Sequence, residues 1–413
     1  MSIMNISENE TAFISSYRKR KAHRVIGLMS GTSLDGVDAV LVDIQSSTQN
    51  SADKITLLHH VYLPYTDPLR KMVADLCSLD RAKIDNLVSV HFGLSEWYAQ
   101  VVLDLLDECA CDADSIDMIC MHGQTVWHAP VPKSFPGPHG EIMVKGTLQL
   151  GASSVVRERT GIPVVSDLRS ADMAAGGEGA PLSPFTDLQL FGSESEGRII
   201  QNIGGIGNAT ILPEGSSKSK VFAFDTGPGN MIIDAIVELK TEGAQHYDPE
   251  GSIAATGTVC EELVRECMLD EYFQRKPPKS TGREIYGVDF TRDFLQRTNK
   301  RGLSFEDSVA TATAFTAESI ARSYKDFILP YCSIAKTLIC GGGALNLTLL
   351  QMIQDRVPEG IEVTTTNSYG IPDQGREAMA FAVIGHESLM GRPGNLPEVT
   401  GAKAPVVLGV VTL

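Results

Sequence analysis

Two strand–turn–strand patterns, each with a glycine-rich turn, constrain the fold of this chain more than any other feature. The first has apolar strands at 24–29 and 37–44 around the turn SGTSLDG at 30–36, and the second covers 198–212 with the turn GGIG. Neither turn leads into a helix, and neither carries the lysine of a P-loop. Each half of the chain therefore opens with a β-hairpin, which indicates an α/β fold built by duplication.

The stretch FDTGPGN, from Phe224 to Asn230, follows the second hairpin and precedes a helical pattern. Asp225 ends an apolar strand. Gly227 and Gly229 allow the next backbone N–H groups to turn toward a ligand at a helix start, where negative charge is favoured. A carboxylate beside such a turn suits phosphoryl transfer. By itself, however, the stretch is better explained as a tight turn with Asn230 as the helix N-cap.

Several other polar groups follow predicted strands, where open α/β sheets place ligand contacts. The buried strand 118–121 leads to the candidate hydroxyl-binding residues His122, Gln124 and Thr125. A later strand leads to three glycines, Gly341 to Gly343, which would permit the flat approach of a ring such as adenine. Glu377 lies near the start of a helix predicted from about residue 374. The first hairpin turn could wrap phosphates, with Asp35 near Mg²⁺.

The 413 residues predict two lobes: one formed by 24–192 and 373–413, the other by 193–372. Residues 1–23 are polar and end in a basic run, which predicts a disordered tail. The proline-rich segment 129–146 is interpreted as a loop or flap rather than a regular element.

The formal charge of −16 argues against nucleic acid or an anionic membrane as the main partner. The eight cysteines are scattered and form no C-x-x-C pair, which is typical of a reducing compartment. We find no apolar run long enough to span a bilayer and expect a cytoplasmic location. Nothing in the composition decides whether the chain is a monomer or a homodimer.

Taken together, the motifs resemble those of the anhydro-N-acetylmuramic acid kinase family, which includes levoglucosan kinase relatives. They occur over nearly the whole chain in this order: MSGTSLDGVD (29–38), HGQT (122–125), TGI (160–162), DLRSAD (167–172), GAPL (179–182), NIGGIGN (202–208), FDTGPGN (224–230), PPKSTGRE (277–284), CGGGALN (340–346) and RPGNLPEVTGA (392–402). The resemblance implies a two-lobed, actin-like ATPase fold of the duplicated ribonuclease H-like type, with a central nucleotide cleft.

The resemblance also implies the reaction and its residues. The family uses ATP and Mg²⁺ to couple hydrolysis of a 1,6-anhydro bridge to phosphorylation of the sugar O6. Its proton acceptor corresponds to Asp225, and its second acid corresponds to Glu377. Asp35 is the candidate Mg²⁺ ligand. The candidate sugar contacts are His122, Gln124, Thr125, Asp167 and Arg169. The candidate nucleotide contacts are Gly31, Thr32, Ser33, Leu34, Asp35, Gly36, Val37, Asp38, Asn202, Gly204, Gly205, Gly227, Gly229, Gly341, Gly342 and Gly343.

Three departures from the family pattern leave the sugar open: the long segment 129–146, Ala171 and Glu178. Anhydro-N-acetylmuramic acid is the leading substrate, and levoglucosan is the alternative. A non-catalytic actin-like nucleotide-binding module would share the fold without needing both acids. A polyphosphate phosphohydrolase would favour a more basic composition.

Overall fold

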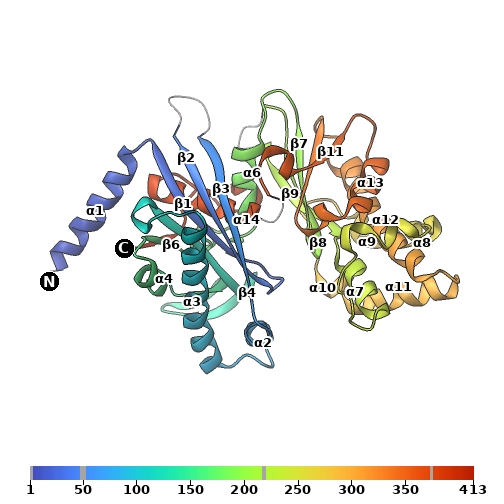
Figure 1. Cartoon of the computed structure of the whole chain (residues 1–413), viewed down its shortest axis with the longest axis horizontal. Coiled ribbons are helices and arrows are strands. Elements are labelled where there is room, and N and C mark those ends of the chain that lie inside the picture. The colour runs from blue at the N-terminus through green and yellow to red at the C-terminus, as the bar shows by residue number, and fades with distance from the viewer. Residues whose placement is uncertain (1–2, 47–52, 216–219, 373–374) are drawn as a thin grey trace. The chain divides into compact units, whose positions relative to one another are not determined.

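The computed structural model describes residues 3–46, 53–215, 220–372 and 375–413, and divides into two compact units (Figure 1). Unit 1 is Met1–Leu190 with Gly375–Leu413, and unit 2 is Phe191–Gln374. The sequence predicted crossings between the lobes at 192/193 and 372/373 and a first lobe that begins at residue 24, whereas unit 1 starts before that residue. Residues 373–374, where the chain returns to unit 1, lie outside the described part.

The sheet of unit 1 has the order β12-β6-β4-β1-β2-β3, with β5 paired to β4. The first three strands form an antiparallel meander, and β4 and β6 then add in parallel beside β1. The strands are β1 (Ala22–Ser30), β2 (Gly36–Gln45), β3 (Lys54–Pro64), β4 (Met118–Gly137), β5 (Gly140–Leu150), β6 (Val164–Ser166) and β12 (Val410–Thr412).

Helices cover both faces of this sheet because its central strands are apolar on both sides. Ile26 of β1 and Leu41 of β2 belong to a core with α3, whereas Gly27 of β1 approaches α14 so closely that a Cβ would lie 2.0 Å from the Ala378 carbonyl oxygen. The unit 1 helices are α1 (Ile3–Lys19), α2 (Asp67–Leu76), α3 (Ile84–Glu108), α4 (Ser153–Thr160), α5 (Ser170–Ala174), α6 (Ser183–Phe191), α14 (Arg376–Met390) and α15 (Pro397–Thr400), with a 3-10 turn at Ala113–Ser115.

Unit 2 has a five-stranded sheet with the order β11-β10-β7-β8-β9. Its long helix α12 begins with a capping box at Ser304 and Asp307 and packs Ile320 and Tyr324 against the sheet. The strands are β7 (Arg198–Ile203), β8 (Ile206–Leu212), β9 (Phe222–Pro228), β10 (Lys336–Cys340) and β11 (Glu362–Thr365). The helices are α7 (Met231–Lys240), α8 (Glu261–Cys267), α9 (Glu271–Gln274), α10 (Arg283–Tyr286), α11 (Val288–Lys300), α12 (Phe305–Phe327) and α13 (Leu347–Arg356), with 3-10 turns at Pro249–Gly251, Ala254–Thr256, Gly342–Leu345 and Thr366–Tyr369.

The two units repeat one topology. In each, a three-stranded antiparallel meander is followed by two parallel strands, so β3-β2-β1-β4-β6 corresponds to β9-β8-β7-β10-β11. This is the ribonuclease H-like strand order. The duplicated α/β fold expected from the two glycine-rich hairpins is confirmed.

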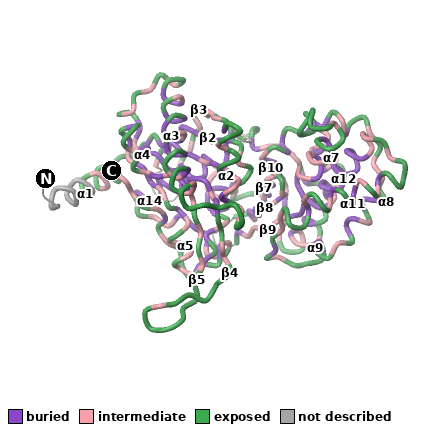
Figure 2. Tube along the Cα trace, turned by 90° about the horizontal axis from the view of Figure 1, so that it is seen from below, coloured by how far each residue is buried: buried purple, intermediate pink, exposed green. Residues whose placement is uncertain are grey.

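The prediction that 129–146 is a loop is wrong. β4 and β5 form an antiparallel hairpin there, and it projects from unit 1 as an exposed ribbon (Figure 2). Its pairing is interrupted between Ala129 and Lys133, the part of β4 that contains Pro130 and Pro132. Proline cannot donate to a ladder, so an interrupted edge strand accommodates both residues.

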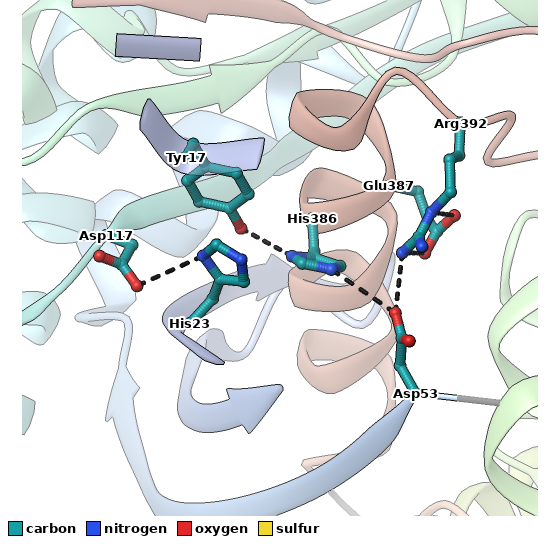
Figure 3. Close-up of polar contacts among 7 residues, drawn as sticks. All are labelled: Tyr17, His23, Asp53, Asp117, His386, Glu387 and Arg392. Atoms are coloured by element: carbon teal, nitrogen blue, oxygen red, sulfur yellow. Dashed lines mark hydrogen bonds and ion pairs between the residues drawn. The ribbon is translucent and has the colours of Figure 1, made fainter. Parts of the chain in front are cut away.

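The prediction of a disordered tail at 1–23 is also wrong, because α1 is helical and β1 begins at Ala22. Tyr17 is fully buried: its hydroxyl lies 2.7 Å from His386 Nδ1, and its ring stacks on His23 with centroids 4.0 Å apart (Figure 3). Arg18 Nε donates to the Leu389 carbonyl at the end of α14, over a distance of 2.7 Å. The buried Tyr17 therefore anchors α1 to unit 1, although the polar composition of this segment did not predict a helix.

His386 is the titratable centre of this docking site. Its Nε2 lies 3.7 Å from Asp53, which is paired with Arg392 (Figure 3). Burial, followed by the charges of His23 and Arg392, lowers the pKa of His386 to about 3. The folded protein thus holds this histidine neutral at a pH where an unfolded chain protonates it, and the resulting stability is present above about pH 6.5 and is lost as the pH falls below that value.

We predict that His386→Gln weakens the acid destabilisation of the protein. Between pH 6.5 and 4.5, the free energy of unfolding should fall less steeply than in the wild type, by about 1.4 kcal/mol per pH unit. Urea unfolding at a series of pH values measures both slopes. His139→Gln, at an exposed position of unit 1, is the matched control and should keep the wild-type slope. Equal slopes for His386→Gln and the wild type would contradict the prediction.

Candidate active site

The turn between β1 and β2 exposes short polar side chains on a constrained backbone. Thr32, Ser33 and Asp35 are exposed, and Leu34 has a positive φ of 59°. Ser33 Oγ donates to Asp35 Oδ1 over 2.7 Å, and Gln124 Nε2 donates to the Gly31 carbonyl over 3.0 Å. The turn is thus held from β4 while its outer face stays accessible, as a phosphate-binding turn requires.

Three other members of the predicted phosphate loop are less accessible. Gly36 is buried, and a Cβ there would lie 2.7 Å from the Tyr62 ring. Val37 is fully buried in the unit 1 core. Asp38 is partly buried and lies 2.8 Å from His60 Nε2. Burial raises the pKa of Asp38, and the contact with His60 opposes that rise.

Glu377 lies in the first turn of α14, as the sequence predicted. Burial raises the pKa of Glu377; Asp38 adds to the rise, whereas Arg376 and Arg169 lower it. Unit 1 therefore gathers Glu377, Asp38 and Arg169 in one electrostatic neighbourhood. These residues come from α14, β2 and the loop after β6, three parts of the chain that are distant in sequence.

The residues after β6 and within β4 also meet in unit 1. Arg169 Nε donates to His122 Nε2 over 2.9 Å, and His122 Nδ1 lies 2.6 Å from the Gly123 carbonyl. Burial, with the charge of Arg169, lowers the pKa of His122 well below its usual value, so the ring is neutral and Nδ1 carries the proton. Burial also lowers the pKa of Arg169 to about 10.

The other predicted sugar contacts differ in accessibility. Gln124 is fully buried and helps to hold the hairpin turn. Thr125 is half-buried, and its hydroxyl accepts a hydrogen bond from Gln149 Nε2 over 3.1 Å. Asp167 is exposed at a positive φ of 55°, and Ser170 Oγ donates to it over 2.5 Å. Of the three, Asp167 and Thr125 are accessible to a ligand.

Asp172, at the end of the DLRSAD motif, has a structural role because its carboxylate is buried and hydrogen-bonded. It is fully buried and accepts hydrogen bonds from the Gly179 backbone N–H (2.8 Å), Asn395 Nδ2 (2.6 Å) and Thr400 Oγ1 (2.7 Å). Arg169 Nη1 donates to the carbonyl of the same Gly179 over 2.6 Å. Gly179 therefore connects Arg169 with Asp172 and fixes the loop that carries Arg169.

In unit 2, Asp225 lies in the middle of β9, which continues to Pro228 rather than ending at Asp225 as the sequence suggested, and segment 279–281 contacts it. Its Oδ2 accepts the Thr281 backbone N–H over 2.9 Å, and its own N–H donates to the Lys279 carbonyl over 3.2 Å. Burial raises the pKa of Asp225 to about 6, while the Thr281 N–H lowers it, Glu284 raises it and Lys279 lowers it. Within the described residues, Oδ1 has no protein donor and remains available to water.

The predicted nucleotide glycines of unit 2 fall into two groups. Gly227 and Gly229 are buried, and a Cβ would lie 2.9 Å from Phe273 at the first and 2.2 Å from the Gly204 carbonyl oxygen at the second, so both are required for packing. Gly205 and Gly342 are exposed, and Gly204 and Asn202 are half-buried.

The three consecutive glycines pack against β7. At Gly341, with φ 79°, a Cβ would lie 2.4 Å from Asn202 Oδ1, and at Gly343 it would meet the Ile203 side chain. The exposed backbone of this group, at Gly342, is therefore supported directly by the strand that carries Asn202.

The sequence reasoning missed Lys279 and the partnership of His60 with Asp38. Lys279 is 6% exposed, directly beside Asp225. Its place in the PPKSTGRE motif was visible, but nothing in the sequence indicates that a lysine between proline and serine is buried. The strand that carries His60 was likewise not predicted.

A sequence profile of the anhydro-N-acetylmuramic acid kinase family matches residues 23–413. The chain belongs to the anhydro-N-acetylmuramic acid kinase family. The chain is 42% identical over 389 residues to the anhydro-N-acetylmuramic acid kinase of Caldanaerobacter subterraneus, covering 94% of this chain and 96% of that protein. It is 40% identical to the Salinibacter ruber protein of the same name, covering 96% and 97% of the two chains.

Solved structures are similar at lower identity. The activator of 2-hydroxyisocaproyl-CoA dehydratase from Clostridium difficile has a TM-score of 0.44 at 11% identity, over 89% of this chain and 95% of that chain. A ROK family glucokinase from Streptomyces griseus has a TM-score of 0.37 at 11% identity, over 87% and 98%. Among the described residues of this family member, no helix is long and apolar enough to cross a membrane.

We predict that Asp172→Asn destabilises this kinase family member, because an amide presents a donor where three donors already converge. The expected loss is about 3 kcal/mol in the free energy of unfolding, measured with urea. Asp80→Asn, an exposed isosteric change in the same unit, is the control. A loss below about 0.5 kcal/mol at position 172 would contradict the structural role assigned to this carboxylate.

Proposed function

We propose that this chain is an ATP-dependent kinase that opens the 1,6-anhydro bridge of 1,6-anhydro-N-acetylmuramic acid and phosphorylates O6, giving N-acetylmuramic acid 6-phosphate. Family membership over residues 23–413 supports the activity. The observation that carries the chemistry is Asp225, a half-buried carboxylate with one oxygen fixed by a backbone N–H and a pKa raised to about 6. Such a group is ionised at neutral pH and basic enough to accept a proton.

Asp225 acts as the proton acceptor. It takes a proton from water as the water oxygen forms a bond to C1 of the sugar. The C1–O6 bond breaks, O6 keeps the electron pair and forms a bond to the γ-phosphorus, and the bond from that phosphorus to the bridging oxygen breaks to release ADP. The proton on Asp225 then returns to solvent. Because Thr281 holds Oδ2, Oδ1 is the oxygen that meets the water.

Unit 1 carries the other proposed groups. By resemblance to the family, Glu377 is the second acid, and Arg169 and Asp38 set the charge around it. The exposed turn at Thr32, Ser33 and Asp35 binds the phosphates of ATP. His122 is neutral and bound to Arg169, so it fixes the guanidinium rather than transferring protons.

The residues of the hairpin turn fit Mg²⁺ bound together with ATP. Mg²⁺ in kinases usually takes one or two carboxylates and completes its shell with phosphate oxygens and water. Asp35 offers such a carboxylate at an exposed turn. The ion would offset charge on the transferred phosphate. Among described residues, the one three-ligand cluster is Asp53, His386 and Glu387, at the docking site of α1.

The alternatives are not favoured. Both relatives described above are named anhydro-N-acetylmuramic acid kinases. The levoglucosan alternative depended on segment 129–146, Ala171 and Glu178. Glu178 is exposed and contributes its backbone N–H to the Thr400 carbonyl, so its side chain is not part of the buried network. A non-catalytic nucleotide-binding module would not need a base such as Asp225. We place the activity in the cytoplasm, without a nucleic-acid partner.

We predict that Asp225→Asn loses about 10²–10⁴-fold in kcat, because an amide cannot accept the proton of water. The assay couples ADP release to NADH oxidation with Mg-ATP and anhydro-N-acetylmuramic acid, and ³¹P NMR identifies a 6-phosphate monoester. Asp289→Asn, at a fully exposed carboxylate of the same unit, should match the wild type.

Calorimetric titration with a non-hydrolysable ATP analogue checks that Asp225→Asn still binds nucleotide. Turnover within about tenfold of the wild type would remove Asp225 from the mechanism. A wild type that phosphorylates levoglucosan but not the muramic sugar would overturn the substrate assignment and leave the role of Asp225 intact.

A further inference from the structure

Lys279 lies in an aromatic cage in unit 2. Its Nζ is 4.5 Å from the ring centroid of Phe327, 4.6 Å from that of Tyr272 and 5.9 Å from that of Phe224. The side chain is 6% exposed, and its ammonium group donates to the Tyr272 carbonyl over 3.3 Å. Within the described residues, Lys279 forms no ion pair, and Asp326 and Asp225 act on it only through their charge. A buried cation without an ion pair is costly, so its retention needs a reason.

Lys279 and Asp225 contact the same neighbouring residues. Phe224 precedes Asp225 on β9, and Tyr272 of the cage donates its hydroxyl to the Asp225 carbonyl over 2.6 Å. The Lys279 carbonyl accepts the Asp225 N–H, and two residues later the Thr281 N–H reaches the carboxylate. Anchoring the Lys279 side chain therefore fixes the segment that holds the carboxylate of Asp225.

The charge of Lys279 acts on the same carboxylate. The pKa of Asp225 is raised chiefly by burial and further by Glu284, whereas the Thr281 N–H and the Lys279 ammonium lower it. Burial and Arg275 lower the pKa of Lys279 to about 8, while Asp326 and Asp225 oppose the shift, so the ammonium is mostly charged at neutral pH. Of the groups that shift the Asp225 pKa, Lys279 is the one cation.

We propose that Lys279 is a positioning residue for Asp225: its caged ammonium group holds segment 279–281, with its Thr281 N–H and its positive charge, against the part of β9 that carries the carboxylate. This inference rests on the proposed function, in which Asp225 is the base. It explains why a cation is buried where methionine would fill the aromatic cage at a lower desolvation cost.

The test compares Lys279→Met with the wild type over pH 5 to 8, by following ADP release from Mg-ATP and the anhydrosugar. Loss of the charge should move the acid limb of kcat/KM to higher pH, by up to about one unit. The deficit should then be largest at pH 5, up to about tenfold, and vanish by pH 8, because Asp225 is ionised there in both the wild type and the variant. The affinity for a non-hydrolysable ATP analogue should not change.

Two variants separate this effect from a general loss of structure. Lys279→Arg keeps the charge and should retain the wild-type limb, and the exposed neighbour change Lys276→Met should behave as the wild type. Lys279→Gln is the second neutral variant if Lys279→Met does not fold. A deficit that is the same at every pH, or no deficit, would overturn the inference. An inactive wild type would instead overturn the proposed function.

Discussion

The parallel pairing of the first and fourth strands is the interaction on which both units depend. In unit 1 it aligns Ser30 of β1 with Gln124 of β4, and in unit 2 it aligns Asn202 of β7 with Cys340 of β10. The glycine-rich turn of each meander begins at this edge, and the polar or glycine-rich residues of the parallel strand lie beside it. One backbone arrangement, used twice, thus produces both the hairpin turn held by Gln124 and the glycine group supported by Asn202.

Among the described residues, three carboxylates of the proposed site are partly buried without a full set of hydrogen-bond donors, and burial raises their pKa. Asp225, Glu377 and Asp38 each have a raised pKa for which desolvation is the first cause, and each has a local group that limits the rise. By contrast, Asp172 is fully satisfied by three donors and stabilises the loop that carries Arg169. The number of donors at each carboxylate therefore separates the proposed chemical groups from the structural one.

The sequence predicted the parts of the fold that local patterns determine. Both hairpins, the helix after Asp225 and the helix that carries Glu377 follow from apolar periodicity and glycine turns. The sequence did not predict α1, because its docking depends on Tyr17 meeting His386 across 369 positions. The hairpin at 129–146 was misread as a loop because two of its prolines, Pro130 and Pro132, fall where the β4–β5 pairing is interrupted.

In the candidate site, too, local sequence patterns did not predict contacts between residues that are distant in sequence. Asp225 could be chosen from its motif, but its environment comes from Thr281 and Lys279, more than fifty positions away. Motifs identify which residues are present at a site, whereas the distant contacts that set their protonation require the fold.

The ionisation of Asp225 itself tests the account most directly. A ¹³C NMR titration of the protein labelled at aspartate Cγ, with Asp225→Asn to assign the resonance, measures this pKa without any assay of turnover. The account predicts a value near 6, because burial outweighs the Thr281 hydrogen bond. A value of about 4, that of an exposed aspartate, would show that the carboxylate is not desolvated and would contradict its role as the base.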